Sequence, residues 1–184
     1  MSSDKLSKAE IITALGKLND LLEKKQVIGE LCLFGGAAMV LAFDARESTR
    51  DVDAIFVPKK EFLDAAKSVS EEMGYDEHWL NDGVKGFVSE KGDVTSDGLP
   101  VFSHLRLVRP TTEYLLAMKC LASRLGGYDG AGDRGDIKKL CQELKVSSVS
   151  QVLDIIESYY PAARVLPKSR YLIEEIMEEM EEAE

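Results

Sequence analysis

The stretch Leu31–Val57 reads LCLFGGAAMVLAFDARESTRDVDAIFV, and its pattern decides the fold. An apolar run before Gly35 and Gly36 predicts a strand that ends in a sharp turn, and residues 37–43 predict a short helix. The alternating apolar residues at the end of the stretch predict a second strand. A strand, helix and strand in this order predict an α/β (α+β) fold.

Two carboxylates, Asp51 and Asp53, stand two positions apart in the second predicted strand. Side chains at i and i+2 of a strand lie on the same face, so these two should project together. Like charges at this spacing repel each other, and a divalent cation between them would relieve the repulsion. The glycine turn lets backbone N–H groups approach an anion at the start of the helix. A cation site beside a phosphate cradle predicts phosphoryl or nucleotidyl transfer.

The order of these motifs resembles the nucleotidyltransferase superfamily typified by DNA polymerase beta, in which a GG or GS turn precedes a strand bearing Asp-x-Asp. Arg46 and Thr49, ahead of Asp51-Val52-Asp53, resemble the R…T-x-D-[IV]-D run of toxin-type nucleotidyltransferases from AbiE- and MenA-like toxin–antitoxin pairs. The resemblance implies a nucleotidyltransferase-like mixed sheet and a magnesium-dependent transferase that uses an NTP. As acceptor it implies either an RNA, such as a tRNA, or a protein hydroxyl, and as partner a cognate antitoxin.

The same resemblance assigns roles within the stretch. Asp51 and Asp53 would be catalytic and would hold Mg²⁺ (or Mn²⁺). The nucleotide would be bound by residues of the turn and the following loop, namely Gly35, Gly36, Arg46 and Thr49. Two features depart from the family pattern. Fourteen residues separate Gly36 from Asp51, slightly more than is usual there, and no convincing third carboxylate follows on a later strand.

A second part of the chain also resembles the toxin-type pattern. LLAMKCLASR at residues 115–124 is followed by DRGDIKKL at residues 133–140, like the family's helix-borne Lys and the D-x-x-D that opens another helix. The resemblance implies that Lys119 contacts the triphosphate and that Asp133 or Asp136 positions the site or helps to deprotonate the acceptor. Taken alone, Lys119 is more typical of a snorkelling lysine and Asp133 of a helix cap. Taken with the Asp-x-Asp motif, the three fragments occur in the family's order, which favours the roles that the resemblance implies.

The segment WLND at residues 79–82 resembles the same family. Trp79 or Asn81 would then line the base or acceptor pocket. A buried aromatic ring beside a capped turn is the alternative interpretation.

Apolar periodicity predicts the remaining elements. These are helices at residues 6–25, 59–73, 113–125, 149–160 and 168–184, and a strand at residues 101–108. Residues 126–135 contain five glycines and predict a mobile loop. We expect a nucleotidyltransferase core at residues 1–110, with a helical C-terminal part at residues 111–184 packed on it.

Composition limits the class of protein. The chain has 184 residues, of which 45% are hydrophobic and 30% charged, as in globular proteins. No apolar run approaches the roughly 20 residues that span a bilayer, and the N-terminus lacks the apolar core of a signal peptide. The sequence therefore predicts a cytoplasmic protein without a membrane contact. Its 3 cysteines are scattered, which is typical of core residues and not of a disulfide framework or zinc site.

The net charge of −10 argues against a protein that coats nucleic acid over its whole surface. Residues 104–145 nevertheless carry 8 Lys or Arg against 5 Asp or Glu, a local charge of +3. This basic segment is either a landing surface for RNA or an ordinary solvated helix face.

Two further functions stay open. The missing third carboxylate favours a catalytically inactive nucleotide-binding or regulatory module on the same fold. The last helix carries seven Glu from Glu174 onward, which is compatible with a protein-interaction module.

Overall fold

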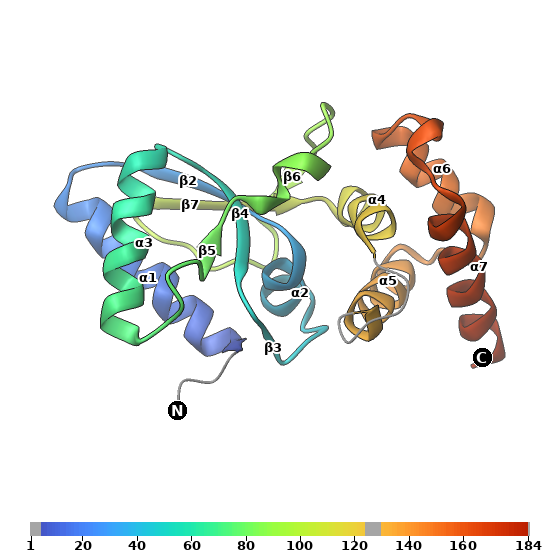
Figure 1. Cartoon of the computed structure of the whole chain (residues 1–184), viewed down its shortest axis with the longest axis horizontal. Coiled ribbons are helices and arrows are strands. Elements are labelled where there is room, and N and C mark those ends of the chain that lie inside the picture. The colour runs from blue at the N-terminus through green and yellow to red at the C-terminus, as the bar shows by residue number, and fades with distance from the viewer. Residues whose placement is uncertain (1–4, 124–129, 184) are drawn as a thin grey trace. The chain divides into compact units, whose positions relative to one another are not determined.

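The computed structural model describes residues 5–123 and 130–183 (Figure 1). Within these residues it has seven α-helices, a five-stranded mixed sheet and a two-stranded sheet, which confirms the predicted α/β class. The chain forms two compact units. The first unit comprises Met1–Gly86 and Val94–Arg109, and the second comprises Phe87–Asp93 and Pro110–Glu184. No helix in the described part of the chain combines the length and the apolar character needed to cross a membrane.

The five-stranded sheet has the order β5-β4-β2-β7-β6. Its strands are β2 (Gly29–Leu33), β4 (Val52–Val57), β5 (Leu80–Asn81), β6 (Val94–Thr95) and β7 (Leu105–Pro110). The central strand β2 runs antiparallel to β4 and parallel to β7, and β4 runs parallel to β5. The small second sheet pairs β1 (Leu6–Ser7) with β3 (Ser48–Thr49). The predicted mixed sheet is therefore present.

Three helices belong to the first unit: α1 (Lys8–Lys24), α2 (Gly35–Phe43) and α3 (Lys59–Met73). A capping box starts α1, because the Ser7 side chain accepts from the Glu10 N–H while the Glu10 carboxylate accepts from the Ser7 N–H. The helices α1 and α3 pack side by side (Figure 1). Helix α2 is buried along most of its length, as its unbroken run of apolar residues predicts.

The register of β2 and β4 places the glycine turn beside the Asp-x-Asp motif. Leu33 pairs with Ala54, and the Phe34 N–H donates to the Asp53 carbonyl at 2.8 Å. The residue after Phe34 begins α2, so the first turn of this helix lies next to the start of β4. This is the local geometry that the sequence predicts for residues 31–57.

The second unit contains α4 (Thr112–Ala122), α5 (Gly130–Leu144), α6 (Val149–Tyr159) and α7 (Pro167–Glu182). Thr111 caps α4 by accepting from the Tyr114 N–H. Two 3₁₀ turns, η1 (Gly83–Phe87) and η2 (Ala162–Arg164), complete the described elements.

The segment Phe87–Asp93 belongs to the second unit, although in the sequence it lies between the two parts of the first. We call it the strap. Its backbone is held by tyrosines, because the Ser89 N–H donates to Tyr114 Oη at 2.6 Å and the Tyr160 hydroxyl donates to the Phe87 carbonyl.

Three predicted boundaries were wrong. Residues 130–135 belong to helix α5 and not to a loop, because burial of Ile137, Leu140 and Cys141 outweighs the low helix propensity of the glycines. The remaining residues of the predicted loop, 126–129, lie outside the described part. Helix α4 ends at Ala122, whereas the sequence predicted that it ends at residue 125. Residue 125 also lies outside the described part of the chain.

The third wrong boundary concerns the strand predicted at residues 101–108. Strand β7 is Leu105–Pro110, because its parallel pairing with β2 begins only where Leu105 meets Gly29. Val101, which the alternation placed in the strand, is 94% exposed.

Candidate cation and nucleotide site

The glycine turn packs directly against two of the predicted site residues. Gly35 has a φ of +55°, which L-residues with side chains rarely adopt, and a Cβ there would lie 2.9 Å from Asp53 Oδ2. A Cβ on Gly36 would lie 2.3 Å from Thr49 Oγ1, closer than van der Waals contact allows. Both positions therefore require glycine, and the Asp53 carboxylate lies at the first turn of α2. Backbone N–H groups at a helix start attract negative charge.

Arg46 and Thr49 reach the same turn. Thr49 is buried in β3, and Arg46 Nη1 would lie 3.6 Å from a Cβ on Gly36. Four of the five residues predicted to bind the nucleotide are thus brought together around the start of α2, whereas the fifth, Lys119, belongs to the second unit. The loop after α2 returns to the turn because β3 pairs with β1, where Thr49 faces Leu6.

Asp51 and Asp53 are electrostatically coupled. Asp51 immediately precedes β4 and is half-buried. Its pKa is raised above the ordinary value, first by burial and then by the negative charge of Asp53. A hydrogen bond from Asn81 and the charge of Arg50 act in the opposite direction. The negative charge of Asp53 therefore acts on Asp51, although Asp51 lies just outside the strand in which the sequence placed it.

This pair is suited to a hard divalent cation. Mg²⁺ and Mn²⁺ prefer oxygen ligands and are commonly bound through one or two carboxylates together with substrate phosphates. A cation would remove the repulsion that raises the Asp51 pKa. No group of three or more His, Cys, Asp or Glu side chains gathers as a metal site within residues 5–123 and 130–183. The described donor set is thus two carboxylates, with the phosphates of a substrate as the natural complement.

Trp79 and Asn81 are both candidates for the pocket in the sequence, but they have different environments in the structure. Trp79 is 1% exposed, and its indole N–H donates to the Ala66 carbonyl at 3.0 Å, so it belongs to the core. Asn81 ends β5 in register with Asp53, and its Nδ2 donates to Asp51 Oδ2 at 3.2 Å. Of the two, Asn81 is the side chain at the aspartates. The pairing of β5 with β4 is a long-range contact that no local sequence pattern specifies.

The other predicted catalytic residues form a cluster in the second unit. Lys119 Nζ lies 2.7 Å from Asp136 Oδ2 and 3.1 Å from Asp133 Oδ1. Lys119 is 8% exposed and Asp136 is 1% exposed, so the snorkelling interpretation of Lys119 is wrong. Asp133 lies in the first turn of α5 and does not cap it, because the helix begins at Gly130. The structure therefore brings Lys119, Asp133 and Asp136 together within this unit.

The predicted basic segment at residues 104–145 is largely neutralised by its neighbours. Arg134 pairs with Glu175 and Glu179 of α7. Lys138 pairs with Glu179, and Lys139 with Glu143. In the first unit, the Arg109 guanidinium is buried and stacks on the Phe43 ring at 4.6 Å. These contacts favour the solvated-face interpretation over a continuous landing surface for RNA.

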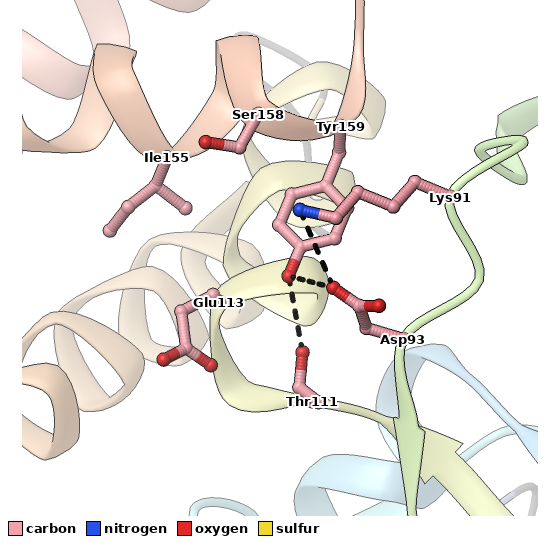
Figure 2. A pocket seen from close by; sticks show the side chains of 7 residues that line it. All are labelled: Lys91, Asp93, Thr111, Glu113, Ile155, Ser158 and Tyr159. Atoms are coloured by element: carbon pink, nitrogen blue, oxygen red, sulfur yellow. Dashed lines mark hydrogen bonds and ion pairs between the residues drawn. The ribbon is translucent and has the colours of Figure 1, made fainter.

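A pocket of about 320 Å³ opens in the second unit where the strap, the start of α4 and α6 meet (Figure 2). It is lined by Lys91, Asp93, Thr111, Glu113, Ile155, Ser158 and Tyr159. The Tyr159 hydroxyl donates to Asp93 at 3.0 Å, and Lys91 lies over the Tyr159 ring while pairing with Asp93. These contacts tie the strap to α6. Sequence reasoning missed the contacts of Tyr159 with Asp93 and Lys91 because each joins residues more than sixty positions apart.

Comparison with known proteins identified no relative. No protein-family model, curated protein or solved structure matches the chain.

Proposed function

We propose that this chain is a metal-dependent nucleotidyltransferase that moves a nucleotidyl group from an NTP to a hydroxyl of an RNA or protein acceptor. The observation that supports it is the contact between the glycine turn and the Asp-x-Asp strand. There the Asp53 carboxylate meets the first turn of α2, and Asp51 is coupled to it. A helix start that attracts phosphate beside two carboxylates that attract a cation is a site for a metal–nucleotide complex.

In this proposal Asp51 and Asp53 hold Mg²⁺ (or Mn²⁺). When bound, the ion neutralises charge on the phosphates and lowers the pKa of an acceptor hydroxyl. The backbone N–H groups of Gly35 and Gly36 bind the triphosphate. It can approach the backbone closely because these two residues have no side chains. Arg46 supplies positive charge to the same turn, and Thr49 a hydroxyl.

The proposed roles of Lys119 at the leaving pyrophosphate and of Asp133 or Asp136 at the acceptor rest on the order of the sequence motifs, since all three residues belong to the second unit. Within that unit Lys119 pairs with both carboxylates, of which Asp136 is the more buried. Within this proposal the protein acts in the cytoplasm as the toxin-like component of a toxin–antitoxin pair.

Thermal stability measured with and without ligand tests the proposal. Mg²⁺ or Mn²⁺ together with an NTP should raise the melting temperature, because a ligand that binds only the folded state stabilises it by mass action. The double variant Asp51→Asn with Asp53→Asn should abolish the shift. The matched control, Asp44→Asn with Asp64→Asn, removes two exposed carboxylates of the same unit and should keep it. If the melting temperature does not shift with any of the four NTPs and either metal, the proposed enzymatic function is refuted.

The acceptor is identified by a second experiment. Incubation with each labelled NTP, total RNA and purified protein substrates should transfer label to one acceptor class. The double aspartate variant should transfer none.

One observation favours a catalytically inactive nucleotide-binding module instead. The residue in register with Asp53 on β5 is an amide, Asn81, and not a third carboxylate. Such a module would bind an NTP equally well with and without metal, and the melting experiment separates the two functions.

A further inference from the structure

The side chain of Asn81 is fixed at both of its polar ends. Its Nδ2 donates to Asp51 Oδ2 at 3.2 Å, across the pairing of β5 with β4. Its Oδ1 accepts from the Gly83 N–H at 2.9 Å, which closes a turn over two residues. Because the turn uses the oxygen, the NH₂ group is the end that faces Asp51. The amide can therefore hold this carboxylate in one orientation.

An amide at this position differs from a carboxylate in charge and in hydrogen bonding. Asp51 and Asp53 already repel each other, and a third negative charge beside them would add to that repulsion. The Asn81 amide adds no charge, and its N–H group stabilises the ionised form of Asp51. It therefore supports a carboxylate that is ready to bind a cation.

We propose that Asn81 is a positioning residue of the cation site, acting through its hydrogen bond to Asp51. This inference rests on the proposed function, in which Asp51 and Asp53 hold the metal. Groups that donate to a metal-ligating carboxylate orient it, and their loss typically weakens metal affinity about 10- to 100-fold. Asn81 orients Asp51 in this way, and the Gly83 turn holds Asn81.

The test is Mn²⁺ binding in the absence of nucleotide, measured by electron paramagnetic resonance or calorimetry. The variant Asn81→Ser keeps an oxygen that can accept from the Gly83 N–H, but it is too short to reach Asp51. We expect it to bind Mn²⁺ about 10-fold or more weakly than the wild type. The melting temperature of the metal-free protein should hardly change.

The matched control is the same substitution at a structural asparagine. Asn19 is buried in α1, and its Oδ1 accepts from the His104 N–H at 2.8 Å. Asn19→Ser should lower the melting temperature and leave Mn²⁺ affinity unchanged. Unchanged affinity in Asn81→Ser, or weaker affinity only in step with a loss of stability as large as that of Asn19→Ser, would overturn the inference.

A second variant reports on the same contact if Asn81→Ser fails to fold. Asn81→Asp keeps the shape and the acceptor for Gly83 but places a third carboxylate beside Asp51. The metal-free variant should melt below the wild type and regain stability with Mn²⁺. A metal-free melting temperature equal to that of the wild type would overturn the inference.

Different results test the proposed function and the role of Asn81. If the wild type binds no Mn²⁺ with or without NTP, the metal-dependent function itself is refuted. If the wild type binds Mn²⁺ and Asn81→Ser binds it equally well, only the role of Asn81 is refuted.

Discussion

Lys119 Nζ lies 2.7 Å from Asp136 Oδ2, and this carboxylate is almost completely shielded from water. The pair joins α4 to α5. A lysine whose head group reached water could be replaced with little loss of stability. We expect the opposite for Lys119, because removing one partner of a buried ion pair is strongly destabilising.

We therefore expect Lys119→Met to lower the free energy of unfolding by about 3 kcal/mol. The double variant Lys119→Met with Asp136→Leu should recover most of the loss, because no buried charge remains. Urea unfolding of the three proteins gives the measurement. Equal stability of Lys119→Met and the wild type would show that water reaches Asp136.

The glycine turn should tolerate no side chain. Gly36→Ala places a Cβ against the Thr49 hydroxyl, and we expect a loss of about 1–3 kcal/mol from overpacking. Adding Thr49→Ala should recover part of it, since the nearest atom is then removed. Gly92→Ala, where a Cβ would meet nothing within 4 Å, is the control and should change stability little. Thermal unfolding of the four proteins checks this, and a fully stable Gly36→Ala would contradict the geometry of the turn.

Asp82 should make the stability of the protein depend on pH in the acid range. Hydrogen bonds from Lys85 and Lys59 lower the pKa of its carboxyl to about 2. The folded pKa is below that of the unfolded chain, about 4, so the contribution is present above about pH 4 and is lost as the pH falls toward 2. Asp82→Asn should thus melt at a lower temperature than the wild type at about pH 6, and the difference in melting temperature should shrink on acidification.

Because the Asp82 carboxylate is exposed, about 1 M NaCl should also reduce this difference in melting temperature. A difference that is constant with pH would exclude these ion pairs.

The strap should depend on the Tyr114 hydroxyl. Tyr114→Phe leaves the buried Ser89 N–H without its acceptor, and an unsatisfied buried donor costs about 1–3 kcal/mol. Tyr171→Phe removes a hydroxyl from an exposed ring of α7 and should change stability by less than about 0.5 kcal/mol. Hydrogen exchange should then become faster at Ser89 in Tyr114→Phe. Unchanged exchange there would mean that the strap is held without this bond.

Local patterns predicted most elements of the fold. The apolar stripe of α1 and the glycine that ends α3 are signals contained within a few turns of chain, so both helices were found. The same holds for the glycine turn next to Asp53, because an apolar run and a glycine pair are local features. The start of α5 among glycines could not be predicted, since packing against α4 and not propensity decides it.

The sequence by itself thus determined the α/β class and the glycine turn ahead of the Asp-x-Asp motif. Only the tertiary structure decided that Asn81 meets Asp51 and that Trp79 belongs to the core. It also decided that Lys119 is a buried partner of Asp136. The physical reason is distance along the chain: strand and helix periodicity act over a few residues, whereas hydrogen bonds and ion pairs between elements depend on how distant segments pack.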